Sequence, residues 1–418
     1  MKLAVVGAGS TYTPEVIDGL VRLRDRLPVE ELALQDTAAA RLDVVARFAQ
    51  RMLDRAGHPL RLRTTTSLED AAAGANAALV QIRVGGQAAR MVDESVPLAC
   101  GCLGQETTGF GGLAKALRTV PVVLEIAGRV RAVAPEAWIV DFTNPVGIVT
   151  KALLDAGHRA VGLCSAAMVF RQHFARILDV SADRIELDHA GLNHLTWELG
   201  VRLDGEEILP RLLEEHGDRV APATGLPAEL VRRLGSVPSY YLHYFYEHDG
   251  VVEQQRTQMS RAEEVAGIEA ELLELYADEK LAEKPELLKR RGGAGYSEAA
   301  VELLASLLGS AGEGVHVINL ANRGTLPFLR DEDVVEVPAR VSPEGVAPAP
   351  LPQLGPLERG LVAHVSAYEE LALDAALHGG RERVFRALLA HPLIGQADVA
   401  EQLTDRLIDA NRQYLAWA

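Results

Sequence analysis

The fold of this chain is decided by the stretch KLAVVGAGSTYTP, residues 2–14. An apolar run ends in a glycine-rich turn, and a proline suited to the first turn of a helix follows. Gly7 and Gly9 match the first two glycines of the dinucleotide-binding turn, in which backbone N–H groups approach a pyrophosphate. Tyr12 replaces the third glycine, which only tightens helix–strand packing, so we expect the turn to bind phosphate still.

Short apolar runs alternate with amphipathic stretches as far as residue 165. Strands are expected at residues 3–6, 32–34, 60–65, 77–82, 138–142 and 160–163, and helices at about 14–26, 41–56, 113–133 and after Pro145. This alternation predicts an α/β fold whose residues 1–165 form a Rossmann-type, doubly wound parallel sheet that binds NAD. Ligands should bind beyond the carboxyl ends of its strands.

The pattern changes after residue 165, and a mixed α+β domain is predicted over residues 166–418. Antiparallel strands are expected within 187–203, 315–320 and 334–341, and helices near 261–276, 297–308 and 357–415. We expect this domain to supply the substrate site and an oligomer interface, with its C-terminal helices packing back on the rest.

Composition excludes several classes of protein. With 48% hydrophobic and 24% charged residues in 418, the chain is neither disordered nor fibrous. A net charge of −16 argues against nucleic acid or an anionic membrane as partner, so an anionic substrate would need a locally basic pocket. Three cysteines and the absence of a signal-like N-terminal run predict a cytoplasmic protein.

The candidate cofactor residues are the turn Gly7, Gly9, Ser10 and Thr11 together with Asp36, which closes the second predicted strand. A carboxylate there accepts from a ribose hydroxyl and repels a 2′-phosphate, which favours NAD over NADP. The alternative is a glycine-rich turn that binds nothing.

Cys164 and His194 are the candidate metal ligands. A thiolate and a neutral imidazole can hold a divalent cation whose open positions take substrate oxygens. Two ligands thirty residues apart form no compact metal motif, and a cysteine after an apolar strand is often simply buried in the core.

A rival interpretation is a 2-hydroxy-acid dehydrogenase. Glu215-His216-Gly217-Asp218 resembles the catalytic His loop of lactate and malate dehydrogenases, and Asn144-Pro145-Val146 resembles their Asn-Pro turn. However, His216 follows RLLEE at a predicted exposed helix end, which favours a solvated surface histidine.

Several separated motifs together resemble glycoside hydrolase family 4, and particularly its 6-phospho-β-glucosidases. They occur in this order: QIRVGGQAARMVDESVPLACGCLGQETTGFGG (81–112), FTNPVG (142–147), GLC (162–164), GLNHL (191–195), SYYLHYFY (239–246), RRGGAGYS (290–297) and ALLAHPLIG (387–395). The resemblance covers nearly the whole chain.

The resemblance implies hydrolysis without the paired carboxylates of most glycosidases. Members of the family use NAD⁺ and a divalent metal, usually Mn²⁺. Hydride leaves C3 of the sugar, a base removes the C2 proton, the C1 oxygen is eliminated, water adds, and the hydride returns. NAD is therefore catalytic and is not consumed.

The resemblance also implies roles for individual residues. Cys164 and His194 correspond to the metal ligands, Asn193 to a sugar contact, and Tyr241 to the C2 base. A phenol has an ordinary pKa near 10, so a tyrosine base needs positive charge nearby. From spacing alone an aromatic cluster is more often core, and Tyr240 and Tyr244 are the alternatives for the base.

The general acid is less clearly implied. Relatives carry Asp, Asn or His after the metal-binding cysteine, whereas this chain has Ser165, a weak acid. Glu106 of GQETTG is the remaining acidic candidate, and the alternative is that it caps the turn.

The substrate phosphate is expected to meet Arg90 and Arg261, with Asn144 contacting sugar or phosphate and Arg83 lying near the cofactor. A surface salt bridge with Glu264 is the alternative for Arg261. The expected partners are a phosphorylated sugar and further copies of the chain, in a homodimer or homotetramer. An α-linked or unphosphorylated substrate stays open, and a binding-only relative is disfavoured because Cys164, His194 and Tyr241 are all present.

Overall fold

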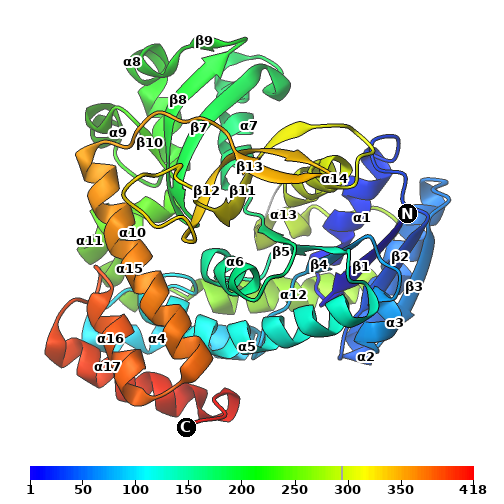
Figure 1. Cartoon of the computed structure of the whole chain (residues 1–418), viewed down its shortest axis with the longest axis horizontal. Helices are drawn as coiled ribbons and strands as arrows, with labels where there is room; N and C mark the ends of the chain where they lie inside the picture. The colour runs from blue at the N-terminus through cyan, green and yellow to red at the C-terminus, as the bar shows by residue number, and fades with distance from the viewer. Residues whose placement is uncertain (293–294) are drawn as a thin grey trace.

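The computed structural model describes all residues except 293–294, which belong to the RRGGAGYS motif. Its described residues form one sheet of thirteen strands with helices on both faces (Figure 1). The strand order is β10-β8-β7-β12-β11-β6-β5-β4-β1-β2-β3, with β13 paired to β12 and β9 to β8.

The N-terminal part of the sheet confirms the predicted parallel, doubly wound α/β fold. Its strands are β1 (Lys2–Val6), β2 (Glu31–Gln35), β3 (Arg61–Thr65), β4 (Ala77–Val80), β5 (Trp138–Asp141) and β6 (Ala160–Gly162). All of them pair in parallel in the order β3-β2-β1-β4-β5-β6. The apolar runs form these strands because both faces of a parallel sheet are buried under helices.

Helices connect these strands. They are α1 (Thr13–Arg22), α2 (Ala39–Arg55), α3 (Leu68–Ala72), α4 (Gly86–Ser95), α5 (Gly109–Val133), α6 (Val146–Asp155) and α7 (Ala166–Leu178). Pro14 lies in the first turn of α1, where its missing N–H costs nothing.

The sheet continues beyond residue 165 through an antiparallel pairing of β6 with β11 (Gly314–Ala321). The further strands are β7 (Ile185–Leu192), β8 (Leu195–Leu203), β9 (Glu206–Glu207), β10 (Val237–Pro238), β12 (Val334–Ser342) and β13 (Gly345–Pro348). β7 and β8 form a hairpin whose turn is Asn193-His194. This hairpin brings its turn residues to the same region of the sheet as the end of β6.

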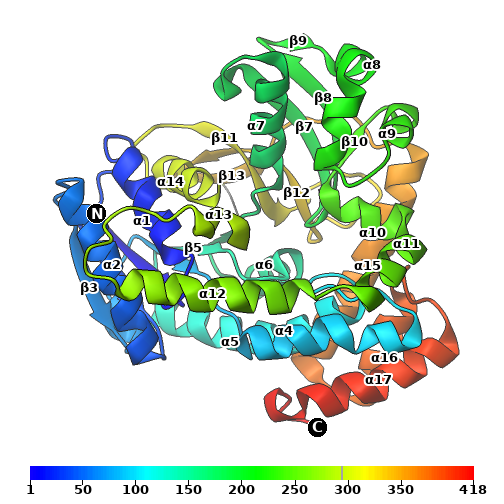
Figure 2. The same ribbon diagram turned by 180° about the vertical axis from the view of Figure 1, so that it is seen from behind.

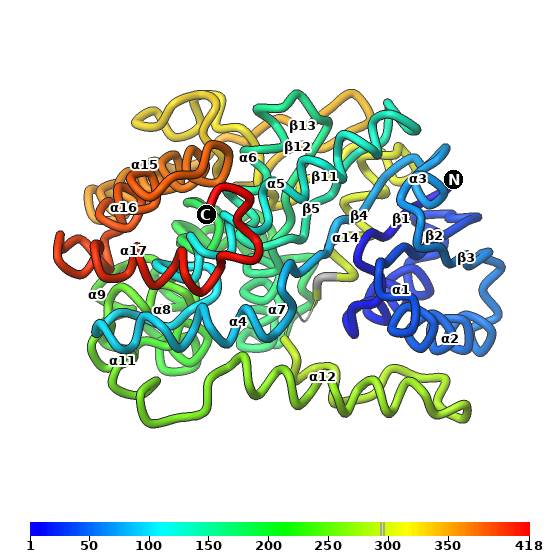
Figure 3. The backbone as a smooth tube through the Cα atoms, turned by 90° about the horizontal axis from the view of Figure 1, so that it is seen from below, coloured from blue at the N-terminus to red at the C-terminus, as the bar shows by residue number. Residues whose placement is uncertain are grey.

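Helices from the later chain cover the N-terminal part (Figures 2 and 3). α12 (Arg261–Ala277) lies against α2 and α4, and α14 (Tyr296–Leu307) lies against α1. α15 (Pro356–His378), α16 (Arg381–Ala390) and α17 (Ala397–Asn411) pack on α5. The shorter helices are α8 (Leu209–Val220), α9 (Ala228–Leu234), α10 (His243–Tyr246), α11 (His248–Thr257) and α13 (Leu287–Arg291).

One hydrophobic core extends from Leu3 in β1 to Leu415 near the end of the chain. A smaller hydrophobic cluster lies between α7, α8 and β8 and includes Phe174, Val201 and Leu212. Within the described part of the chain, no helix has the length and apolarity needed to cross a membrane.

Candidate active site

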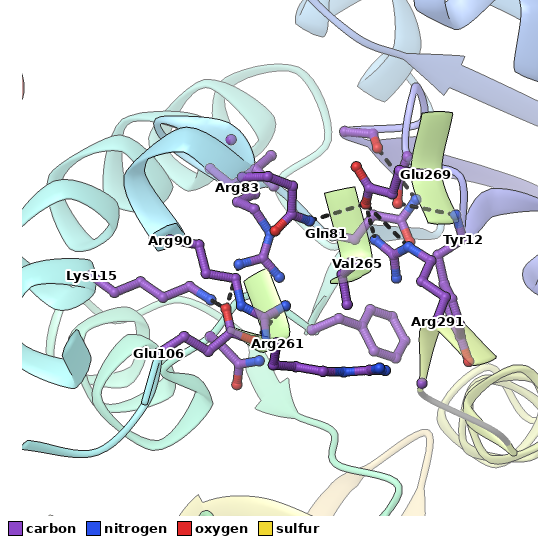
Figure 4. Close-up of a pocket in the computed structure, with 18 of the residues that line it drawn as sticks. Tyr12, Gln81, Arg83, Arg90, Glu106, Lys115, Arg261, Val265, Glu269 and Arg291 are labelled. Carbon is purple, nitrogen blue, oxygen red and sulfur yellow. Dashed lines mark hydrogen bonds and ion pairs between the residues drawn. The ribbon is translucent and has the colours of Figure 1, made fainter. Parts of the chain in front are cut away.

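A pocket of about 1570 Å³ opens beyond the carboxyl ends of the parallel strands. This is the position that the βαβ pattern predicts, because ligands of such sheets bind where the connections diverge. Most of the predicted site residues line it, namely Gly7, Gly9, Ser10, Asp36, Arg83, Arg90, Glu106, Asn144, Cys164, His194, Tyr241 and Arg261. Figure 4 shows part of this pocket.

The glycine-rich turn has the geometry expected of a phosphate-binding turn. Gly7 has a φ of 85°, and a side chain there would meet the Gln81 carbonyl oxygen at 2.9 Å. The Gly9 N–H donates to Asp36 Oδ2 over 2.8 Å, and a Cβ on Gly9 would lie 2.8 Å from the same atom. Both glycines are therefore required, and they hold Asp36 beside the turn as a cofactor site needs.

Thr11 differs from its neighbours in the turn. Its side chain is wholly buried and does not line the pocket. Its carbonyl oxygen accepts a hydrogen bond of 2.8 Å from the Tyr276 hydroxyl in α12. Thr11 thus fixes the backbone of the turn to α12 through this hydrogen bond.

Two arginines and one carboxylate surround the turn, with Arg41 from α2 and the other two residues from the later helices α12 and α13. Arg41 donates from Nε to the Gly9 carbonyl oxygen over 2.6 Å and pairs with Glu269 at 3.1 Å. Arg291 pairs with Glu269 at 2.9 Å and stacks over Tyr12 (Figure 4). Asp36 lies at the same turn, so two arginines face two carboxylates, and the guanidinium groups offer the hydrogen-bond donors that suit a pyrophosphate.

Cys164 and His194 reach the pocket from different strands. Cys164 follows β6, is 7% exposed, and forms no disulfide. His194 lies in the hairpin turn with a φ of 62°, an uncommon conformation for a non-glycine residue. Burial lowers the pKa of His194 to about 4, so its imidazole is neutral, as metal binding requires.

The donor set fits an open metal site. The His194 Nδ1 atom lies 2.8 Å from the hydroxyl of Thr107, which leaves Nε2 for a metal. Within the described residues, no group of three or more His, Cys, Asp or Glu side chains could hold a metal. Cys164 and His194 would therefore supply two ligands, and substrate and water would supply the others.

Tyr241 stacks on His194, with ring centroids 3.6 Å apart and planes at 8°. Burial raises the pKa of Tyr241 well above its ordinary value, and the neighbouring Cys164 adds to this effect. The phenol is consequently neutral in the free protein, and a cation must be bound nearby before it can act as a base. Of the two alternative bases, Tyr240 is half exposed. The ring centroid of Tyr244 lies 6.3 Å from that of Tyr241.

Glu106 is surrounded by cations. Its carboxylate pairs with Arg83, with Lys115 Nζ at 2.6 Å and with Arg90 at 3.6 Å (Figure 4). Burial alone would raise the pKa of Glu106, but these cations outweigh burial and hold the pKa well below its ordinary value. The free protein therefore holds Glu106 as a carboxylate, which is the charge state of a base and not of a proton donor.

Arg83 belongs to this cluster and lines the same pocket as the glycine-rich turn. Arg90 also pairs with Glu94 at 2.7 Å, so two arginines and Lys115, which is only partly protonated near pH 7, face two carboxylates and leave a small positive excess. Such a cluster provides the locally basic pocket that an anionic substrate needs in an acidic chain.

The remaining predicted residues are placed as follows. Arg261 lines the pocket but pairs with Glu264, so the expected substrate contact and its alternative are both compatible with the structure. Asn144 and Ser165 line the pocket. Asn193 does not line it, and its side-chain amide instead donates to Glu336 Oε2 over 2.8 Å. His216 lies in α8, outside the pocket.

Sequence reasoning missed two buried charged residues. Lys115 lies in α5, where GLAKALR has the pattern of an ordinary amphipathic helix and gives no signal. Burial lowers the pKa of Lys115 to about 7. Glu336 interrupts the apolar strand VVEV at 334–337. A charged residue is rarely buried without a partner, so an acidic residue within an apolar strand is the sequence feature that could have identified it.

Comparisons with known proteins agree with these observations. The model for "Family 4 glycosyl hydrolase" matches residues 2–180, and that for its C-terminal domain matches residues 189–394. A Bacillus subtilis protein named "Probable 6-phospho-beta-glucosidase" is 37% identical, with 99% of this chain and 97% of that one aligned. An Escherichia coli 6-phospho-β-glucosidase is 32% identical over 99% and 96% of the two chains.

Solved structures agree as well. The Thermotoga maritima 6-phospho-β-glucosidase with manganese, NAD⁺ and glucose-6-phosphate superposes with a TM-score of 0.91 at 30% identity, covering 99% of each chain. A Cryptosporidium parvum lactate dehydrogenase, at 13% identity and a TM-score of 0.58 over 91% of this chain and 98% of its own, shares the fold alone. With both family models matched and relatives aligned over the full length, the chain belongs to glycosyl hydrolase family 4.

Proposed function

We propose that this chain hydrolyses 6-phospho-β-glucosides with NAD⁺ and Mn²⁺, by oxidation at C3, elimination, hydration and re-reduction. One observation carries the proposal. The two candidate metal ligands and the candidate base, Cys164, His194 and Tyr241, meet in the same pocket as the glycine-rich turn. A redox cofactor and a metal-bound sugar can therefore lie side by side.

The described residues fit both groups. Gly7, Gly9 and Asp36 form the turn for NAD⁺, and Cys164 with His194 provides soft and borderline donors for the metal. When bound, NAD⁺ would accept hydride from C3, the resulting ketone would acidify the C2 proton, and the metal would polarise the sugar oxygens and stabilise the negative charge that develops. Thr107 orients the His194 ring through Nδ1.

Tyr241 is proposed to remove the C2 proton. Its ring lies flat against His194 and its phenol is close enough to Cys164 for their charges to interact, so a metal held by these two residues would bring the positive charge that stabilises the phenolate. The phenol that results can return its proton during the addition of water, and the residue ends in its starting state.

The net-positive cluster of Arg83, Arg90 and Lys115 is proposed to bind the sugar phosphate, with Arg261 at the pocket rim. An arginine guanidinium binds phosphate through two parallel hydrogen bonds. Glu106 would then orient these cations. In the charge states of the free protein neither residue protonates the leaving oxygen, because Glu106 is ionised and the Ser165 hydroxyl is too weak an acid.

The test is release of p-nitrophenol from p-nitrophenyl-β-glucoside 6-phosphate, with NAD⁺ and Mn²⁺ each present or omitted. We expect turnover only with both, no net NADH, and exchange of the C2 hydrogen with solvent deuterium. The matched α-linked and unphosphorylated glucosides serve as controls. Faster turnover of either control would mean that the chain acts on a different glycoside within the family. Stoichiometric formation of NADH from lactate or malate without metal would mean that the chain is a dehydrogenase.

A further inference from the structure

A buried carboxylate contacts the hairpin turn that carries His194 and the strand next to β6, after which Cys164 lies. Glu336, in β12, is 1% exposed. Its Oε1 atom lies 3.0 Å from Nε2 of His189, and its Oε2 atom accepts from Asn193 over 2.8 Å and from Asn319 over 2.9 Å. His189 and Asn319 are fully buried as well.

These contacts follow a row of paired residues across four strands. Gly162 in β6 is opposite Asn319 in β11, which is opposite Glu336 in β12, which is opposite Gly191 in β7. Cys164 follows Gly162 by two residues, and His194 follows Gly191 by three. One carboxylate therefore contacts both a neighbour of the Cys164 strand and the residue that precedes His194.

The row is tight at the Cys164 end. A Cβ on Gly162 would lie 2.9 Å from the Asn319 Cβ and 2.2 Å from the Thr150 hydroxyl. β6 is thus pressed directly against Asn319. A displacement of Asn319 would move β6, and with it the residue at its carboxyl end.

The His194 end needs external support. The backbone of His194 has a positive φ, which persists in a non-glycine residue only when its surroundings enforce it. The amide of Asn193 is fixed by Glu336, and Glu336 is itself fixed by His189, whose Nδ1 atom lies 2.7 Å from Glu198. Glu336, His189 and Glu198 are excluded from water and Asn193 is partly buried, so these hydrogen bonds are strong and their loss is costly.

We propose that Glu336 is a positioning residue that sets the separation of Cys164 and His194 by binding Asn193 and Asn319 at once. The inference rests on the proposed function, in which Cys164 and His194 hold the metal. It also gives Asn193 a role through Glu336 in place of the expected sugar contact. Outer contacts of this kind commonly change metal affinity by about 10- to 100-fold when they are removed.

The first experiment uses the full chain with Glu336→Gln, which cannot accept from His189, Asn193 and Asn319 together. Mn²⁺ titration, followed by the electron paramagnetic resonance signal of the free ion, should show about 10- to 100-fold weaker binding. The affinity for NAD⁺ should stay that of the unaltered chain. Unchanged Mn²⁺ affinity would overturn the inference.

A matched pair of variants separates positioning from general destabilisation. Asn319 and Asn322 are both fully buried, but the Asn322 amide binds the carbonyl oxygens of Leu326, Leu329 and Arg330 and not Glu336. Asn319→Ser and Asn322→Ser should both lower the Tm, and only Asn319→Ser should weaken Mn²⁺ binding. Equal weakening by the two would overturn the inference.

A metal-free measurement keeps the inference distinct from the proposed function. In ¹⁵N-histidine-labelled apoprotein, the ring resonances of His194 should shift in Glu336→Gln and keep their positions in Asn322→Ser. The absence of such a shift would show that His194 is placed without Glu336. If the resonance shifts and the Mn²⁺ affinities of the variants are as expected but the unaltered chain hydrolyses no glycoside, only the proposed function is contradicted.

Discussion

At the scale of single residues, the structure distinguishes Tyr241 from the other tyrosines of SYYLHYFY, because its ring stacks on His194. Tyr241→Phe removes the proposed base and keeps the ring that packs on His194. We expect kcat to fall by about 10²- to 10⁴-fold, because this is the usual contribution of a positioned base.

The measurement is p-nitrophenol release, with Mn²⁺ and NAD⁺ binding checked separately and expected to persist. Tyr244→Phe is the matched control, since Tyr244 also lines the pocket and its ring lies 6.3 Å from that of Tyr241. A larger loss in the Tyr244 variant would move the base to that residue.

Glu106 is the residue whose expected role the structure changes most. Glu106→Gln leaves Arg83, Arg90 and Lys115 without their shared carboxylate. Loss of one partner from a buried ionic cluster typically costs about 3–5 kcal/mol, so the Tm should fall clearly.

Activity of the Glu106→Gln variant distinguishes the two roles. If Glu106 orients cations, the fold-loss should be the same for p-nitrophenyl and methyl glycosides. A loss concentrated in the methyl glycoside, whose leaving group needs a proton, would restore Glu106 as the general acid.

At the scale of elements, the hairpin β7–β8 and its neighbour β12 share a buried charge. Burial alone would lower the pKa of His189, but Glu198 and Glu336 outweigh it and raise the pKa to about 10. The unfolded value is near 6.5. A raised pKa means that the folded state binds the proton more tightly, so this stabilisation is complete below about pH 6.5 and is lost as pH rises through about 10.

The corresponding prediction concerns thermal unfolding at constant ionic strength. Between about pH 6.5 and 10 the Tm of the unaltered chain should fall more steeply than that of His189→Gln, so the two curves converge. Parallel curves would show that His189 is neutral in the folded protein.

At the scale of the whole molecule, one sheet joins the two predicted domains through β6 and β11, and α12 and α14 cover the N-terminal part. Neither part buries its apolar faces alone. Calorimetry of the metal-free chain should therefore give one transition, with equal calorimetric and van't Hoff enthalpies. Two transitions, with the earlier one shifted by NAD⁺, would support a boundary at residues 165 and 166 that divides independent folding units.

The sequence alone determined the parallel sheet, the glycine-rich turn and the family, because apolar periodicity and turn chemistry act over a few residues. It also predicted Cys164, His194 and Tyr241 as site residues through short motifs, and the structure places all three in one pocket. Only the tertiary structure decided how charged groups pair. Glu106 is held as a carboxylate by residues up to 23 positions away, and Asn193 contacts Glu336 across 143. Charge state and side-chain partners depend on burial and on distant neighbours, which a linear pattern does not contain.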